Sequence, residues 1–200
     1  MRITVLGFGN VGAQIGRLWV AQGHLVTAGL RAGGKGTEKA KELGVTVAEP
    51  AAAVKGADVI ALALPWQAVE ATLASLGPID GKIVLDATNP LRADLGVIVP
   101  EAGSGAEQIS RWAKGAHVVK AFNTIGAALF GDPDFDMFYC GDDERAKDVV
   151  RGLIEETGMR PVDAGPLKNA GYLEQIAGLW VDLAVKGRLQ GAFGFKLLKK

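Results

Sequence analysis

The stretch RITVLGFGNVG, residues 2–12, decides the fold of this 200-residue chain. Its first five residues form a mostly apolar run that predicts a buried parallel strand. A G-x-G-x-x-G pattern follows at once and opens a helical pattern, which is the context of a dinucleotide-binding turn. Gly7 permits the tight turn, Gly9 lets the backbone approach a pyrophosphate, and Gly12 lets the helix pack on the sheet. We expect the amides of the helix N-terminus to bind the phosphates.

Outward from this stretch, strand-like apolar runs alternate with helical patterns along the chain. Strands are predicted at residues 2–6, 25–29, 45–48, 58–65, 82–88, 117–123, 137–141 and 161–165. Helices are predicted at residues 13–23, 37–44, 50–56, 66–76, 105–115, 143–158 and 169–187. This alternation predicts an α/β protein of the Rossmann type, with a doubly wound, mostly parallel sheet and a C-terminal helical extension.

The end of the second predicted strand carries basic residues where an acid is usual. An NAD-binding fold places an aspartate or glutamate about twenty residues beyond the fingerprint, where it binds the ribose hydroxyls. This chain has Leu30, Arg31 and then Lys35. Arg31 can make a bidentate contact with a 2′-phosphate, and Lys35 can add a second cation. We therefore predict an NADP-binding Rossmann domain over residues 1–165, with the helical segment 166–200 packed on it as one compact unit.

The ends of later strands should lie at the same edge of the sheet, where ligands of doubly wound folds bind. The fourth strand ends in LALPW, where Pro65 makes the turn rigid and Trp66 could form a wall of the pocket or a core anchor. Thr88 and Asn89 follow the fifth strand, and Phe122 and Asn123 end the sixth. An aromatic ring and an amide at this position could bracket a planar ring.

Candidates for acid/base catalysis are missing from this edge. The two histidines, His24 and His117, lie near the starts of predicted strands, which is the opposite edge. The sequence shows no Ser-His-Asp, Cys-His or metal-spaced cluster, so we predict neither a catalytic side chain nor a metal. A dehydrogenase that acts on a hydroxyl group needs such a group. Hydride transfer between two heteroaromatic rings needs mainly the correct orientation of the rings. The sequence therefore favours this reaction over the oxidation of a hydroxyl group.

Composition argues against several classes of partner. Acidic and basic residues balance at 22 each, so no nucleic acid or anionic membrane surface is expected as a partner. The apolar run at residues 59–64 is too short to span a membrane. The single cysteine, Cys140, lies in an apolar run and is expected to be buried in a cytoplasmic protein.

Several longer motifs resemble the NADPH-dependent coenzyme F420 reductases. These motifs are GFGNVG, GLR with Lys35, LPW, KIVLDATNP, VVKAFNT, GDDERAK, PVDAGPL and FGFKLL, spread over nearly the whole chain. The resemblance implies hydride transfer between NADPH and a deazaflavin, coenzyme F420, bound beside the nicotinamide. It also implies NADP contacts at the fingerprint, Arg31, Lys35, the residues after Leu64 and the Asn89 loop, and a homodimer.

Residues and resemblance together give one set of predicted cofactor-binding positions. They are Gly7, Phe8, Gly9, Asn10, Val11, Gly12, Leu30, Arg31, Lys35, Leu64, Pro65, Trp66, Val69, Thr88, Asn89, Phe122, Asn123 and Ile125. Of these, Leu64, Pro65, Trp66, Asn89 and Ile125 are expected on the nicotinamide side.

Two alternatives to this function stay open at the level of sequence. VVKAFN and PVDAGPL also resemble the reductase domain of the STEAP metalloreductases, so the second ring could be FMN or FAD, with iron or copper downstream. A non-enzymatic NADP-sensing module is also compatible with the lack of acid/base residues.

Overall fold

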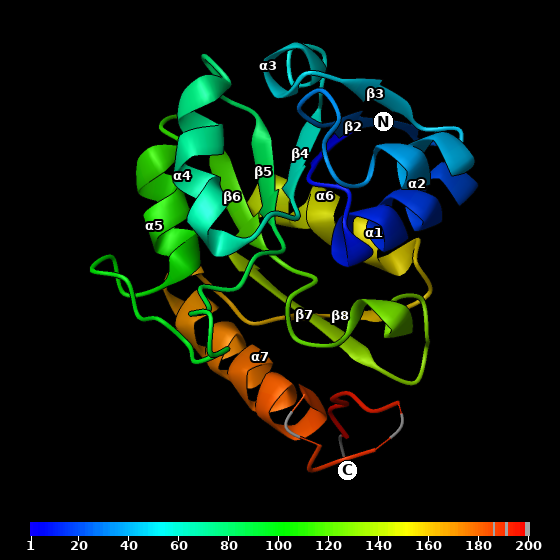
Figure 1. Cartoon of the computed structure of the whole chain (residues 1–200). Helices are drawn as coiled ribbons and strands as arrows, with labels where there is room; N and C mark the ends of the chain where they lie inside the picture. Colours follow the sequence, from blue (N-terminus) through cyan, green and yellow to red (C-terminus); the bar gives the residue numbers. More distant parts are fainter. Residues whose placement is uncertain (186, 191, 199–200) are drawn as a thin grey trace.

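A computed structural model describes residues 1–185, 187–190 and 192–198 and contains a single eight-stranded sheet in these residues (Figure 1). The strand order is β3-β2-β1-β4-β5-β6-β7-β8. The strands are β1 (Arg2–Leu6), β2 (Leu25–Gly29), β3 (Thr46–Ala48), β4 (Val59–Leu62), β5 (Ile83–Asp86), β6 (His117–Lys120), β7 (Asp136–Gly141) and β8 (Arg160–Asp163). The predicted Rossmann-type architecture is confirmed.

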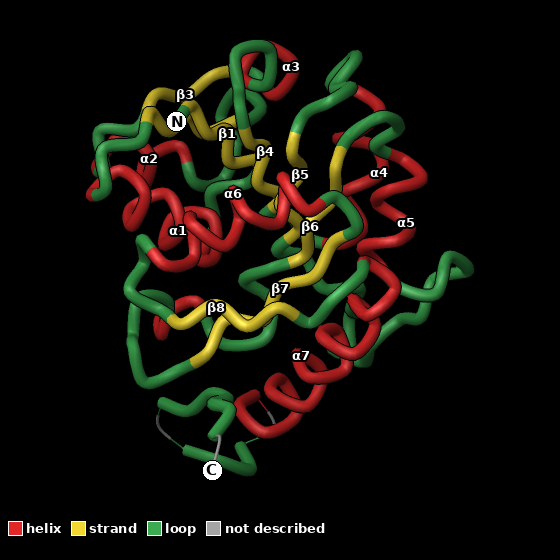
Figure 2. Tube along the Cα trace, turned by 180° about the vertical axis from the view of Figure 1, so that it is seen from behind, coloured by secondary structure: helices red, strands yellow, loops and turns green. Residues whose placement is uncertain are grey.

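Helices cover both faces of this sheet (Figure 2). They are α1 (Asn10–Ala21), α2 (Thr37–Glu42), α3 (Pro50–Ala53), α4 (Trp66–Ser75), α5 (Gly105–Trp112), α6 (Glu144–Glu155) and α7 (Ala170–Val185), with 3-10 turns η1 (Ala127–Leu129) and η2 (Leu167–Asn169). Trp19 of α1 and Val150 of α6 belong to the core on one face, and Val69 of α4 and Ile109 of α5 to the core on the other. Apolar residues at helical spacing on each helix cause this division. Among the described residues, no helix is long and apolar enough to cross a membrane.

The first six strands are parallel, and the strand order reverses beside β1. Leu6, the last residue of β1, pairs with Gly29 of β2 on one side and with Leu62 of β4 on the other. The connections from these strands therefore diverge to opposite sides at this point. A crevice at such a switch point is where doubly wound sheets bind nucleotides.

Strand β7 departs from the parallel pattern. It pairs antiparallel with β6, at Val119 with Gly141 and Lys120 with Cys140, while β8 runs parallel to β7. The chain between β6 and β7, residues 121–135, contains the short turn η1 and no crossover α-helix. Parallel neighbours need such a crossover, so the chain returns in the opposite direction. As a result, the whole connection stays at the carboxyl edge of β6.

Three strands end earlier than predicted, and after β5 a side chain turns the chain out of the sheet. We predicted strands as far as Pro65, Thr88 and Asn123, but β4, β5 and β6 end three, two and three residues earlier. After β5, the Asp86 carboxylate accepts hydrogen bonds from the amide (2.8 Å) and hydroxyl (2.7 Å) of Thr88, which turns the chain out of the sheet. In the other direction, α1 begins at Asn10 rather than at residue 13.

A buried ion cluster joins the sheet to α7. The ammonium of Lys120, fully buried, lies 2.8 Å from Asp86 and 3.2 Å from Glu174, and it donates to the Thr88 carbonyl. Glu174 in turn accepts from the amides of Gly105 and Ala106, the first residues of α5. The cluster therefore fixes β5, β6, α5 and α7 against one another. The division of the chain at residue 165 stays a prediction.

Candidate cofactor-binding site

The glycine turn after β1 has the geometry that the fingerprint predicts. Gly7 has a φ of +85°, which favours glycine. A Cβ on Gly12 would overlap the carbonyl oxygen of Gly7, so only glycine lets α1 begin so close to the turn. A Cβ on Gly9 would meet nothing within 4 Å, so this backbone is open to a ligand. Gly9 lies at the N-cap of α1, where free amides and the helix dipole attract phosphate.

The loop after β2 presents two cations to solvent. Arg31 and Lys35 are exposed, and neither side chain has a hydrogen-bond or ion-pair partner among the described residues. The amide of Ala32 donates to the Glu49 carboxylate (2.9 Å), which holds the start of the loop. Leu30 is buried beneath the loop, so it anchors this segment.

Gly36 fixes this loop against the glycine turn. It has a φ of +102°, and a Cβ there would overlap the carbonyl of Phe8. We expect Gly36→Ala to shift the loop and weaken NADPH binding about tenfold, because Arg31 and Lys35 would move away from the turn. Isothermal titration with NADPH measures this effect. Gly44→Ala is the control, since Gly44 also has a positive φ (+65°) but no atom near its Cβ; equal losses for the two variants would contradict the role of the loop contact.

Two pockets meet at the carboxyl edge of the strands. The small pocket, about 700 Å³, lies between the glycine turn and the ends of β4 and β5, and it is lined by Leu64, Pro65, Trp66, Thr88 and others. The large pocket, about 930 Å³, lies between α1, the β6–β7 connection and α7. Both are lined by Asn10, Val11 and Asn89, so they adjoin at these three residues.

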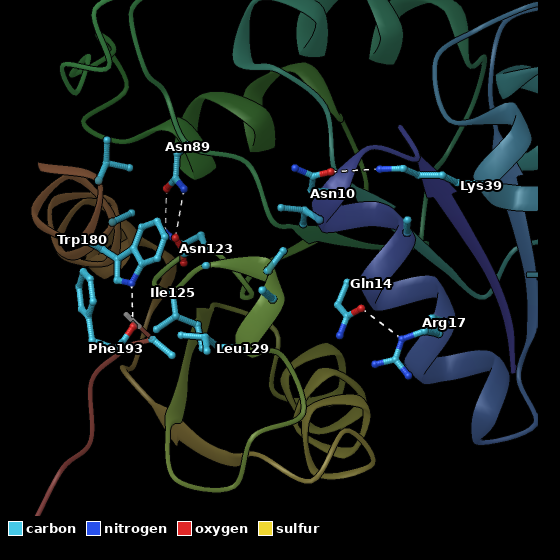
Figure 3. A pocket seen from close by; sticks show the side chains of 18 of the residues that line it. Asn10, Gln14, Arg17, Lys39, Asn89, Asn123, Ile125, Leu129, Trp180 and Phe193 are labelled. Atoms are coloured by element: carbon cyan, nitrogen blue, oxygen red, sulfur yellow. Dashed lines mark hydrogen bonds between the residues drawn. The ribbon is translucent and has the colours of Figure 1, made fainter. Parts of the chain in front are cut away.

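The C-terminal part of the chain forms one wall of the large pocket. Trp180 of α7 donates from its indole to the Phe193 carbonyl (3.0 Å), and the two rings stack with centroids 5.6 Å apart (Figure 3). Ile125 and Leu129 lie beside these rings, and Gln14 and Arg17 of α1 lie across the cavity (Figure 3). Ile125 was predicted on the nicotinamide side and lines the large pocket. Trp180 and Phe193 were not predicted, because nothing in their local pattern separates them from core residues.

Two side chains on the opposite wall were also missed. The ammonium of Lys39 on α2 donates to the Asn10 side chain (3.1 Å), and Arg17 on α1 donates to Gln14 (3.2 Å). All four line the large pocket. Lys39 thus adds a cation at the N-terminus of α1. The sequence of α2 is typical of a polar surface helix, so it does not predict that Lys39 lies in a pocket.

Four predicted site residues have their side chains in the core. Val69 is fully buried among the residues of α4 and β4 and lines neither pocket. Phe122 is 1% exposed and packs edge-to-face against Trp19 and Phe130, so its ring is not free to stack on a planar ligand. Phe8 and Leu30 are buried as well and line neither pocket. Apolar side chains next to the site gain from burial in the adjacent core, and the role of these four residues in cofactor binding stays a prediction. Trp66 lines the small pocket and also packs on Trp112.

The two histidines have structural partners outside the small and large pockets. His24 lies 2.6 Å from Glu156 and 3.0 Å from the N-terminal amine, and His117 lies 3.4 Å from Asp143. Both lie near the amino ends of β2 and β6, away from the pockets. Within the described parts of the chain, no group of histidine, cysteine and carboxylate residues is arranged to hold a metal.

Cys140 lies in β7 and is fully buried. Burial raises the pKa of its thiol to about 12, because the thiolate would lose its hydration. The thiolate fraction of the folded protein at pH 8 is therefore far smaller than that of a free cysteine. We expect Ellman's reagent at pH 8 to label Cys140 only after denaturation. Rapid labelling of the native protein would show that the thiol is accessible and contradict its placement.

The fold and the glycine turn place this chain in the class of Rossmann-fold dinucleotide-binding proteins. Residues 2–90 match the family model described as "NADP oxidoreductase coenzyme F420-dependent". The chain is 34% identical to the F420-dependent NADP reductase of Methanothermobacter marburgensis and 31% identical to that of Methanocaldococcus jannaschii, each over 96% of both chains. The chain therefore belongs to the family of the F420-dependent NADP reductases, which are oxidoreductases.

Solved structures and a more distant relative complete the comparison. A candidate F420-dependent NADP reductase from Arthrobacter sp. FB24 superposes with a TM-score of 0.89 over all of both chains, at 30% identity. A reductive aminase from Aspergillus terreus shares the fold at 22% identity and a TM-score of 0.67. Metalloreductase STEAP3 of Rattus norvegicus is 28% identical over 88% of this chain but only 36% of its own length. The resemblance found in the sequence is confirmed.

Proposed function

We propose that this protein is an oxidoreductase that transfers a hydride between NADPH and coenzyme F420. One observation carries the proposal: the small and large pockets adjoin at Asn10, Val11 and Asn89, so two planar rings can meet there. With both bound, the nicotinamide and the deazaflavin would supply the two carbons between which the hydride passes, in either direction. The donor and acceptor carbons must then lie about 3–3.5 Å apart.

The residues present fit a dinucleotide. Gly9 leaves its backbone open at the N-terminus of α1, where Asn10 and Val11 add amides for the pyrophosphate. Arg31 and Lys35 offer unpaired cations to a 2′-phosphate. Leu64, Pro65, Trp66 and Thr88 shape the small pocket around the ribose and nicotinamide.

The apolar lining of the large pocket serves the transfer by excluding water. Trp180, Phe193 and Ile125 offer flat or aliphatic surfaces to a ring. Among the described residues that line this pocket there is no histidine, cysteine or aspartate that could exchange protons with a ring, and the one glutamate, Glu42, lies on α2. The protein therefore acts by orienting the two rings rather than as an acid or base.

The 2′-phosphate assignment predicts a change in cofactor preference. Arg31→Ala should weaken NADPH binding about 10- to 100-fold, because a charge-assisted hydrogen bond contributes about 1.5–3 kcal/mol. NADH binding should change less than threefold. Fluorescence titration with each cofactor measures this difference. Lys41→Ala is the matched control, since Lys41 is an exposed lysine on α2 that pairs with Glu38. Equal losses for NADPH and NADH would refute the assignment.

The activity is tested by NADPH oxidation with coenzyme F420, FMN and FAD offered separately. Turnover with F420 alone supports the proposal. The resemblance of VVKAFN and PVDAGPL to the STEAP metalloreductases makes a flavin the second candidate. Turnover only with FMN or FAD would favour an NADPH-dependent flavin reductase. Tight NADPH binding without any turnover would favour the NADP-sensing module.

We further propose a homodimer that works in the cytoplasm. Tyr172 and Leu179 on α7 are 71% and 52% exposed, and such apolar side chains on one helix support an interface. Size-exclusion chromatography with light scattering should give twice the chain mass of 20.8 kDa. A monomer at micromolar concentration would refute the dimer. The cytoplasmic location rests on the buried, unpaired Cys140, and cell fractionation tests it.

A further inference from the structure

The Asn123 side chain contains a buried acceptor without a partner. Asn123 follows β6 and lines the large pocket, yet it is only 5% exposed. Its amide nitrogen donates to the Asn89 side chain (3.0 Å) and to the Leu173 carbonyl (3.2 Å). Its Oδ1 atom is buried and has no hydrogen-bond partner among the described residues. A buried acceptor without a partner is costly, so native structures rarely keep one without a reason.

Two backbone carbonyls determine which way each amide points. Only an NH₂ group can donate to the Leu173 carbonyl, so the Asn123 nitrogen must face α7 and its oxygen must face away. In the same way, the Asn89 nitrogen donates to the Asn123 backbone carbonyl (3.1 Å), which leaves the Asn89 oxygen to accept from Asn123 (Figure 3). Exchanging oxygen and nitrogen in either side chain would break these bonds. The unpaired atom of Asn123 is therefore an acceptor.

The residue before Asn123 has an unusual backbone conformation. Phe122 has a φ of +60°, a left-handed conformation that is unfavourable for a residue with a side chain. Its amide donates to the sulfur of Met137 (3.1 Å), and its ring packs between Trp19 and Phe130. These contacts hold the strained conformation in place. Strain of this kind, maintained by the core, is typical of residues that position a binding group.

We propose that Asn123 Oδ1 accepts a hydrogen bond from an amide-type N–H group of a ring bound in the large pocket. This inference rests on the proposed function, because that function brings such rings to the pocket. The group supplies the missing donor, and Asn89 and Leu173 hold the acceptor in one orientation. Asn123 therefore selects rings that carry an N–H between or beside carbonyl groups.

Two ligand groups have this chemistry. One is the ring N–H between the two carbonyls of the deazaflavin, and the other is the carboxamide of the nicotinamide. Asn123 lines the large pocket but not the small one, which favours the deazaflavin N–H. The two sources can be separated with one analogue each: F420 methylated at that ring nitrogen, and the NADP analogue whose carboxamide is replaced by an acetyl group.

The test crosses these analogues with substitutions at Asn123. Dissociation constants are measured by fluorescence titration for both parent cofactors and both analogues, so the result does not depend on turnover. Wild-type protein should bind one of the two analogues, the methylated F420 if the donor is the deazaflavin N–H, about tenfold more weakly than its parent. Asn123→Ala and Asn123→Leu should bind the parent about tenfold more weakly and show no further loss with the analogue. Leu keeps the bulk of the side chain, so a shared result excludes a purely steric effect of the methyl group.

Gln14→Ala is the matched control. Gln14 lines the same pocket and also carries an amide, but its nitrogen donates to the Phe130 carbonyl and its oxygen accepts from Arg17. This variant should keep the wild-type preference between parent and analogue. The inference is overturned if wild-type protein binds both analogues as tightly as their parents, or if the preference survives in Asn123→Leu. In either case, NADPH oxidation with F420 by wild-type protein would leave the proposed function intact.

Discussion

The Lys120→Met variant is expected to lose about 3–5 kcal/mol of unfolding free energy. Lys120 is fully buried between Asp86 and Glu174, and its removal leaves two carboxylates in the core without their cation. Removing one partner of a buried ion pair usually lowers the unfolding free energy by about this amount, because the other charge stays buried without compensation. The cluster also holds α5 and α7, so we expect the whole domain to be weakened. Urea unfolding followed by circular dichroism measures the loss.

Two further variants make this expectation specific. Lys41→Met removes a lysine whose partner is exposed, and it should change the stability by less than about 0.5 kcal/mol. Adding Asp86→Asn and Glu174→Gln to Lys120→Met removes the uncompensated charges and should restore part of the loss. If Lys120→Met matched Lys41→Met, the cluster would not contribute as described.

The same cluster predicts a pH dependence. Burial by itself would lower the pKa of Lys120, but Asp86 and Glu174 beside it raise that pKa above the ordinary 10.5. The folded protein then binds this proton more tightly than the unfolded chain. The contribution of Lys120 is therefore complete below pH 10.5 and is lost as the pH rises through the folded-state value. The stability difference between wild type and Lys120→Met should therefore stay constant up to about pH 10.5 and shrink only above that pH in urea titrations.

Gly12→Ala is expected to abolish NADPH binding and to destabilise the fold by about 3 kcal/mol. The new Cβ would overlap the Gly7 carbonyl, and neither backbone segment can move without opening the turn. Overpacking of this kind costs about 1–3 kcal/mol, with the upper end for contact with backbone. We expect the affinity for NADPH to fall at least 100-fold, because the amides at the start of α1 would lose their arrangement. Thermal unfolding and isothermal titration measure the two effects.

Gly9→Ala is the informative comparison, since a Cβ at Gly9 meets nothing within 4 Å. Its thermal stability should stay within about 0.5 kcal/mol of wild type. Its affinity for NADPH should nevertheless fall about tenfold or more, because the methyl group would occupy the approach of the pyrophosphate. If NADPH bound equally well to Gly9→Ala, the phosphates would have to lie elsewhere.

Local sequence patterns predicted most of the sheet and the nucleotide half of the site. The signals for β1, β4, β5 and the glycine turn are carried by residues that follow one another in the chain. They can therefore be recognised from the sequence alone. The positive charge after β2 was likewise predicted from one short loop, which contains Arg31 and Lys35. The contacts of Arg31 and Lys35 with a cofactor stay predictions, as do those of the other site residues.

Features that depend on distant residues could not be predicted in this way. Lys120 contacts Glu174 only after β6 and α7 have come together. The local sequence around either residue does not indicate a buried ion cluster. The antiparallel direction of β7 depends on a connection without a crossover helix. Phe122 was placed in the pocket because it ends a strand, but a left-handed backbone turns its ring into the core.

The reversal of β7 has a consequence for how new activities could arise on this scaffold. Because β7 runs antiparallel to β6, residues 121–135 begin and end near the ligand edge, and they contain the short turn η1 but no α-helix or strand. Insertions or deletions in this segment would change the shape of the large pocket while leaving β1 to β6 and the glycine turn untouched. Laboratory evolution toward a different electron acceptor should therefore vary the length of this segment first, and the nucleotide half could be inherited unchanged.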